Sequence, residues 1–129
     1  FPDKFKESER FNLTQLQKDL VFKYMSGYPT EFGYDNQEYA YFFNKFFIYG
    51  DKEIEFDENI DIYNKVGLAY GQLTDVAYII NNDISIILTA TIDVNTNKIY
   101  NDDNYEYDLI GFPFLAQLSR GIFKKISEN

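Results

Sequence analysis

Three strand-like segments joined by short connectors constrain the fold of this chain most. The first begins at Ile60 and alternates apolar with polar side chains, as a half-buried strand does. Residues 75–80 (DVAYII) and 84–94 (ISIILTATIDV) are apolar and rich in β-branched residues, which favours strands. The connectors are an irregular piece over residues 67–71, which begins and ends with glycine, and an Asn-Asn-Asp hairpin over 81–83. Short connections imply antiparallel neighbours, so we predict a three-stranded meander.

Two helices are predicted before the sheet. The first starts at Asn12, which has a glutamine three residues on, at the spacing of a capping box, and it ends at Gly27. The second covers residues 36–48, with Asp35 as its cap. A strand over residues 46–49 is the alternative, because aromatic residues also favour strands.

A third helix is predicted at the C-terminal end of the chain. Pro113 occupies its first turn, and two lysines in its last turn complement the helix dipole. Its expected apolar face consists of Leu115, Leu118, Ile122 and Ile126. This spacing predicts a helix that lies on the sheet.

The predicted fold class is therefore α+β: a three-stranded antiparallel meander, a C-terminal helix packed on it and two N-terminal helices. A chain of 129 residues has the size of one domain. We expect a mainly helical lead-in over residues 1–52, which opens with a loose segment over 1–11. The sheet and its helix follow over residues 53–129.

The composition excludes several kinds of chemistry. The chain has no His and no Cys, which excludes a Ser-His-Asp triad, a thiolate nucleophile, a disulfide and a zinc finger. Twelve Lys and Arg stand against 21 Asp and Glu, for a net charge of −9. This charge opposes nucleic-acid binding, which needs a basic surface. No apolar run approaches the roughly 20 residues of a membrane-spanning helix.

The aromatic content is high, with 12 Tyr and 13 Phe. Core packing is the simplest role for these rings, and those over residues 39–49 are the most concentrated. The alternative is a platform on which bases or sugars stack. For nucleic acid such a platform needs a positive groove, which the net charge opposes.

The acidic run over residues 102–108 resembles a calcium loop in its alternation of possible ligands. The sixth and twelfth positions of such a loop are Gly and Glu, whereas this chain has Tyr107 and Pro113 there. We therefore expect a solvated acidic loop, within a polar segment over residues 95–110.

The most informative motif is Lys65-Val66-Gly67, near the end of the first predicted strand. Taken alone, it is an exposed lysine and a turn glycine. A turn, two further strands and an amphipathic helix follow it. The segments IYNKVGLAYGQLTDVAYI and NDDNYEYDLIGFPFLAQL lie in this part of the chain. Over residues 55–126 the chain resembles the C-terminal half of β-lactamase-like serine hydrolases, the superfamily of class A β-lactamases and penicillin-binding proteins, in an uncharacterised Bacteroidetes-type branch. Their corresponding motif is Lys-Thr-Gly on the strand that lines the active site.

The resemblance implies roles for three residues. Lys65 would be the motif lysine, which helps position a substrate carboxylate and tunes the proton balance of the site. Gly67 would let the substrate lie close against the strand. The backbone N–H of Leu68 would be one oxyanion-hole donor. Val66 replaces the Thr whose hydroxyl helps bind the substrate carboxylate.

The nucleophile motif of that superfamily, Ser-x-x-Lys, is absent. The five serines, none of which has Lys three residues on, are Ser8, Ser26, Ser85, Ser119 and Ser127. Residues 34–36 (YDN) match the Tyr-x-Asn form of the second motif in letters only, and we interpret them as a loop and helix cap. The chain is therefore expected to be catalytically incomplete alone, either as the C-terminal piece of a longer hydrolase or as a non-catalytic relative. The resemblance implies no cofactor or metal, and an exported location.

The strand over residues 84–94 would be an unpaired apolar edge, which is a pairing hazard. We expect it to pair with a missing N-terminal half, with a second copy, or with residues 1–11 or 53–57 folded back. A second interpretation of the whole chain is a small acidic binding protein that neutralises a basic partner. Its size, its charge and surface tyrosines, which are enriched at interfaces, support this alternative.

Overall fold

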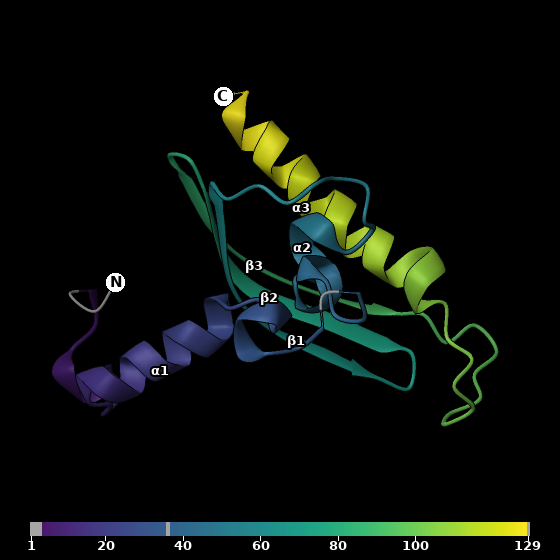
Figure 1. The fold of residues 1–129 in the computed structure, drawn as a ribbon, viewed down its shortest axis with the longest axis horizontal. Coiled ribbons are helices and arrows are strands. Elements are labelled where there is room, and N and C mark those ends of the chain that lie inside the picture. The colour runs from purple at the N-terminus through teal and green to yellow at the C-terminus, as the bar shows by residue number, and fades with distance from the viewer. Residues whose placement is uncertain (1–3, 36, 129) are drawn as a thin grey trace.

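The computed structural model describes residues 4–35 and 37–128. It confirms the predicted α+β class: three antiparallel strands form one sheet, a C-terminal helix lies on it, and helical segments precede it (Figure 1). The strands are β1 (Ile60–Ala69), β2 (Gln72–Asn81) and β3 (Ile84–Asp93), in the order β1-β2-β3. The meander thus follows from the alternation and the short connectors in the sequence.

The two turns of the meander are tighter than predicted. The first consists of Tyr70 and Gly71, whose φ angles of 53° and 88° are those of a mirror-image turn that matches the twist of the strands. Residues 67–71 are therefore not an irregular piece. Gly67 lies within β1, opposite Thr74, and β2 begins at Gln72 rather than at residue 75.

One face of the sheet forms the core. Its buried apolar positions in β1 and β2 are Ile60, Ile62, Leu73, Ala77 and Ile79. The corresponding apolar side chains of β3 are only half-buried. The core therefore becomes thinner from the middle of the sheet towards β3.

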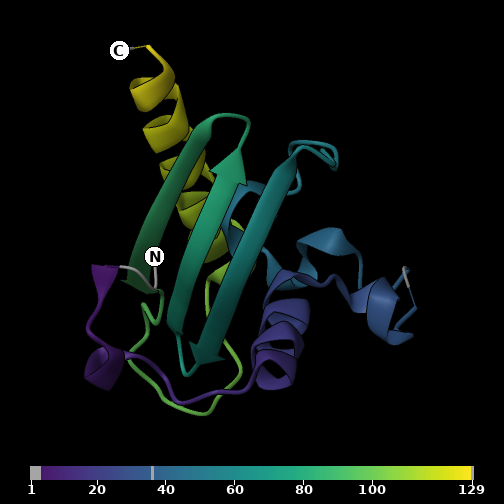
Figure 2. The ribbon, with the colours of Figure 1, turned by 90° about the vertical axis from the view of Figure 1, so that its left-hand side faces the viewer.

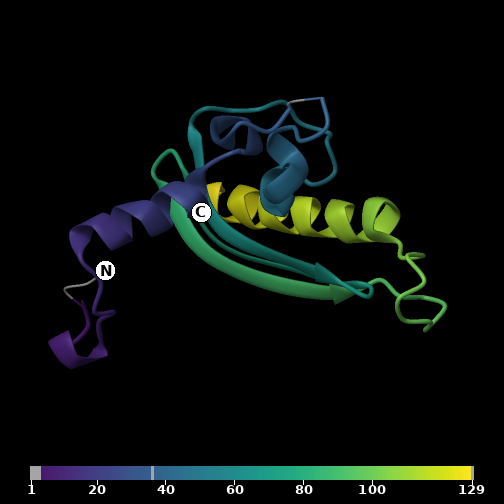
Figure 3. The same cartoon turned by 60° about the horizontal axis from the view of Figure 1, so that its bottom comes forward.

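Helix α3 (Phe112–Ser127) covers this face and follows a π-helical turn over Tyr107–Gly111 (Figure 3). Pro113 lies in its first turn as predicted. Of the expected apolar face, only Leu115 is fully buried, and Ile126 is 43% exposed. The helix instead buries Leu115, Ala116, Ser119 and Phe123.

Helix α1 (Gln15–Ser26) ends at Gly27 as predicted but begins later. The prediction of Asn12 as its N-cap was wrong, because Thr14 takes that role. The Thr14 hydroxyl accepts from the Gln17 N–H at 3.3 Å, and the Gln17 side chain accepts from the Thr14 N–H at 2.8 Å. None of its residues is buried, and the helix projects away from the sheet (Figures 1 and 3).

The helix predicted over residues 36–48 was wrong, and so was the alternative strand over 46–49. The chain forms a 3-10 turn over Tyr41–Asn44 and a short α2 over Phe46–Tyr49, and Asn36 lies outside the described residues. Inside α2 the backbone leaves helical geometry, and Ile48 has φ 72° and ψ −54°. These angles fall in the rare, strained γ-turn region.

Strand β3 has an open outer edge, because it pairs with β2 only (Figure 2). The described parts of residues 1–11 and 53–57 do not pair with it, so the expected fold-back was wrong for those parts; residues 1–3 lie outside the described part. The edge carries none of the usual protection by proline or lysine along its ten residues.

The molecule exposes more surface than its mass requires. Its accessible surface is 9156 Å², whereas a compact monomer of 15.3 kDa exposes about 7,100 Å². Large exposed apolar side chains include Leu16 and Leu20 of α1 and Ile87 of β3, at 79%, 54% and 70% exposure.

Candidate functional site

The three residues singled out by the motif lie together near the end of β1. Lys65 and Gly67 share the face of the sheet that is opposite α3, and Leu68 lies on the other face. All three are exposed, and the Lys65 ammonium donates to the carbonyl of Val66 at 2.5 Å. A Cβ atom at Gly67 would meet no atom within 4 Å, so the surface above it is open.

The backbone of this stretch also faces outward. The turn at Tyr70 closes on the opposed pair Ala69 and Gln72. Opposed pairs in an antiparallel ladder alternate between hydrogen-bonded and non-hydrogen-bonded, so Leu68 falls in a non-hydrogen-bonded pair. Its N–H therefore points to the outer edge of β1, away from β2.

Neither Ser119 nor Ser85 lies near Lys65, where a serine nucleophile would be needed. Ser119 is a completely buried residue of α3, on the opposite side of the sheet from Lys65. Its hydroxyl accepts from the Ile48 N–H and donates to the Ala116 carbonyl. Ser85 lies on β3, at the far edge of the sheet.

A buried polar centre, which sequence reasoning missed, lies beneath β1 and β2. The Lys45 ammonium is fully buried and donates three hydrogen bonds, to Met25 O at 2.7 Å, Ile62 O at 2.9 Å and Asn64 Oδ1 at 2.8 Å. All three of its N–H donors are thus used. The lysine joins the end of α1 to β1.

Asp75 completes this centre from β2. Its carboxylate accepts from Asn64 Nδ2 at 3.0 and 3.2 Å and from the backbone N–H of Phe47 at 3.2 Å. Burial raises the pKa of Asp75, although these bonds and the charge of Lys45 oppose the shift. Burial also lowers the pKa of Lys45 to about 8. Both shifts follow from the cost of keeping a charge in a low-dielectric interior.

The polar centre is a positioning network, since Lys45 and Asp75 are both fully buried and no substrate reaches them. A signal for it was present in the sequence. Asn64 and Asp75 interrupt the apolar set of alternating strand positions, Asn64 in β1 and Asp75 in β2. Buried polar residues at such positions need partners, which here come from residues 44–47.

The strained peptide of Ile48 is held from α3. Its N–H donates to Ser119 Oγ at 2.9 Å, and its carbonyl accepts from Arg120 Nη1 at 2.6 Å. Arg120 also forms an ion pair with the buried carboxylate of Asp51. Burial would raise the pKa of Asp51, but the bonds from Arg120 and the Glu53 N–H outweigh it and lower the pKa.

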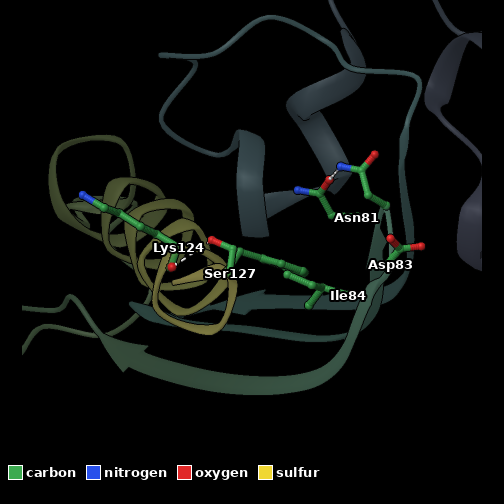
Figure 4. A pocket seen from close by; sticks show the side chains of 7 residues that line it. Asn81, Asp83, Ile84, Lys124 and Ser127 are labelled. Atoms are coloured by element: carbon green, nitrogen blue, oxygen red, sulfur yellow. Dashed lines mark hydrogen bonds between the residues drawn. The ribbon is translucent and has the colours of Figure 1, made fainter. Parts of the chain in front are cut away.

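A hollow of about 560 Å³ lies between the β2–β3 turn and the last turn of α3 (Figure 4). Its lining residues are Asn81, Asn82, Asp83, Ile84, Phe123, Lys124 and Ser127. Two of these polar side chains already form hydrogen bonds within the protein. Asn82 Nδ2 donates to Asn81 Oδ1, and the Ser127 hydroxyl donates to the Lys124 carbonyl. The hollow lies at the opposite end of the sheet from Lys65, because the β2–β3 turn is opposite the β1–β2 turn.

The described residues contain no group of three or more acidic side chains arranged to hold a metal ion. In the acidic run predicted as a solvated loop, the carboxylate of Asp102 is used within the loop itself. It accepts from Asn97 Nδ2 at 2.8 Å and from the Asn104 N–H at 3.1 Å. No helix within residues 4–35 and 37–128 is long and apolar enough to cross a membrane.

Comparison of the chain with protein-family models, with curated proteins and with solved structures gives no match.

Proposed function

We propose that this chain is the C-terminal part of a β-lactamase-like serine hydrolase and supplies one wall of its acyl-transfer site. One observation carries the proposal. Lys65, Gly67 and Leu68 lie in the second half of an outer strand, with an open sheet face and an outward backbone edge. This is the position in which the resemblance places the Lys-Thr-Gly motif.

The proposed roles follow from the chemistry of each group. The Lys65 ammonium attracts a substrate carboxylate, and Gly67 leaves the strand open to close approach. The Leu68 N–H donates to the oxygen on which charge develops during acyl transfer. The serine nucleophile comes from outside this chain, because Ser119 is buried and engaged.

The free edge and the excess surface support the same proposal. A further part of the protein would add a strand to β3 and cover the half-buried side chains of that strand. The excess of about 2,000 Å² is larger than the roughly 800 Å² that each partner buries in a standard interface. An additional part of the fold accounts for such an area better than a small contact does.

The test compares the purified chain with its coding sequence and with reactive probes. We expect a Ser-x-x-Lys motif to be encoded upstream of residue 1, and no adduct in the intact mass of the chain after incubation with a fluorophosphonate or a penicillin. In the longer protein, Lys65→Ala should slow acylation at least about tenfold, which is the loss of about 1.4 kcal/mol of transition-state stabilisation. Lys18→Ala, at an exposed position of α1, is the matched control and should leave the rate unchanged.

Two results would overturn the proposal. One is an open reading frame that starts near residue 1 with no Ser-x-x-Lys motif. The other is acylation of the chain by itself.

The second candidate function is an acidic protein that binds a basic partner. Its net charge of −9 and the exposed rings of Tyr24, Tyr34 and Tyr100 favour it. An open reading frame without the upstream motif would make this the leading function.

A further inference from the structure

An aromatic hollow lies between the end of α1 and the 3-10 turns that follow it. We define it by its lining residues, Tyr24, Pro29, Phe32, Tyr34, Tyr39, Phe43 and Asn44, and its volume is about 680 Å³. The rings of Tyr24 and Phe32 stack with centroids 4.9 Å apart. Tyr39 contacts Tyr34 at 5.4 Å and Phe43 at 4.7 Å, both edge to face.

The rings of this hollow are partly open to solvent. Tyr24, Tyr34 and Phe43 are 61%, 57% and 52% exposed. The faces of aromatic rings carry partial negative charge and attract cations. Exposed ring faces around a concave surface are therefore suited to a positively charged group.

The charge beside the hollow has the complementary sign. The residues next in sequence to its lining include three carboxylates, Glu31, Asp35 and Glu38. Glu38 lies against the Tyr39 hydroxyl, and their hydrogen bond raises the pKa of Tyr39. Of the two lysines next to the lining, Lys45 is buried in its own network, which leaves Lys23 on the surface.

Asn44 adds an acceptor to this region. Its Nδ2 donates to the Gly27 carbonyl at 3.2 Å, whereas its Oδ1 is buried and has no hydrogen-bond partner among the described residues. Buried acceptors are normally paired, and Asn44 lines the hollow, so a ligand that brings an N–H donor to this oxygen would complete its bonding. Glu31 and Asp35 already accept from the backbone N–H groups of Tyr28 and Gln37, both at 2.7 Å, but they keep their negative charge. A sugar or another neutral ring would use the aromatic faces and gain nothing from that charge.

We propose that the aromatic hollow binds a basic side chain, Lys or Arg, on the surface of a partner protein. The ring faces hold the cation, the carboxylates attract it, and its N–H groups supply donors. This inference deepens the second candidate function, a protein that binds a basic partner. It stands independently of the serine-hydrolase proposal, because the hollow uses none of the same residues.

The test uses the whole 129-residue chain and nuclear magnetic resonance titration of its backbone amides. The probe is a short peptide of alternating glycine and lysine, and the matched probe has norleucine in place of each lysine. We expect shifts confined to the hollow, binding of the norleucine peptide at least about tenfold weaker, and weaker binding of the lysine peptide as salt rises.

Variants locate the site within the same experiment. Tyr34→Leu and Phe43→Leu should each weaken binding of the lysine peptide about fivefold, the effect of one cation–π contact. Tyr100→Leu, at a 68% exposed tyrosine outside the hollow, should not change it. The amide spectrum of each variant reports whether it is folded, and the two-peptide comparison needs no variant at all.

Equal binding of both peptides would overturn the proposal in favour of an uncharged apolar ligand. Shifts confined to other surfaces, or no saturable shift, would also overturn it.

Discussion

Ser119 and Ile48 are joined by a hydrogen bond of 2.9 Å, from the Ile48 N–H to the Ser119 hydroxyl, across 71 positions of the chain. Ile48 holds a left-handed φ of 72°, which a β-branched residue rarely adopts. Ser119→Ala removes the acceptor of this buried N–H. We expect a loss of about 1–3 kcal/mol in the free energy of unfolding, measured by urea titration.

Ser127→Ala is the control for this change, since Ser127 is an exposed serine of the same helix. It should alter stability by less than about 0.5 kcal/mol. Equal effects of the two substitutions would show that the strained peptide does not depend on Ser119.

The lowered pKa of Lys45 predicts a specific dependence of stability on pH. Above about pH 8 the folded state holds Lys45 neutral, whereas the unfolded chain keeps it protonated up to a pKa near 10.5. The unfolded state then binds more protons, so this residue adds stability as pH rises and removes it as pH falls through 8. The advantage of the native protein over Lys45→Met should grow by up to about 3 kcal/mol between pH 8 and 10.5.

The comparison of two proteins matters here, because the tyrosines titrate in both and their effect cancels. Urea titrations at three or four pH values supply the measurement. A constant or shrinking difference would show that the three oxygens around the ammonium outweigh its burial.

Asp51 is expected to stabilise the protein through Arg120. Asp51→Asn leaves the guanidinium without its buried carboxylate and should cost about 1.5–3 kcal/mol at pH 7. Glu53 is the second carboxylate that pairs with Arg120, and it is exposed. Glu53→Gln should therefore cost less than about 0.5 kcal/mol. Because the pKa of Asp51 is lowered, its contribution is present above its ordinary value of 3.8 and disappears as pH falls through the lowered pKa. A gap between the Asn variant and the native protein that persists unchanged in acid would contradict this account.

Gly67 is predicted to make the folded chain less stable than an alanine at the same position would. Its place within a strand and the open space beside it mean that Gly67→Ala should stabilise the chain by about 0.5–1 kcal/mol. Gly71→Ala is the contrasting variant, because its φ of 88° and its contact with Asn95 make a side chain costly there. Thermal unfolding of both variants checks the prediction, and destabilisation by Gly67→Ala would contradict it.

The open edge of β3 predicts self-association of the isolated chain at high concentration. The turn at Asn82 closes on the pair Asn81 and Ile84, so the N–H of Thr89 points outward by the ladder alternation. Thr89→Pro should therefore block edge pairing without removing a bond to β2. Light scattering coupled to size exclusion measures the mass, with Thr89→Val as the control that keeps the N–H. A monomeric native chain at all concentrations would contradict the prediction.

The sheet and the helix that closes it could be predicted from local patterns in the chain. Alternation over the three strands, two short connectors and Pro113 are local signals, and local signals set the order and direction of these elements. The choice between Asn12 and Thr14 as the first N-cap was less well determined, because both offer a cap with a glutamine at the same spacing. Local spacing placed Lys65 on the first strand, whereas Gly67 and Leu68 were expected in the connector and instead belong to β1. The role of all three residues stays a proposal.

The path of residues 41–49 depends on contacts that form only when the chain folds. Their aromatic side chains suit a helix or a strand equally, but the N–H groups of Phe47 and Ile48 bond to side chains 28 and 71 positions away. Those side chains belong to the sheet and to α3, and no local pattern encodes their approach. The burial of Lys45 has the same origin: a lysine is stable there only because three distant oxygens converge on it once the chain has folded.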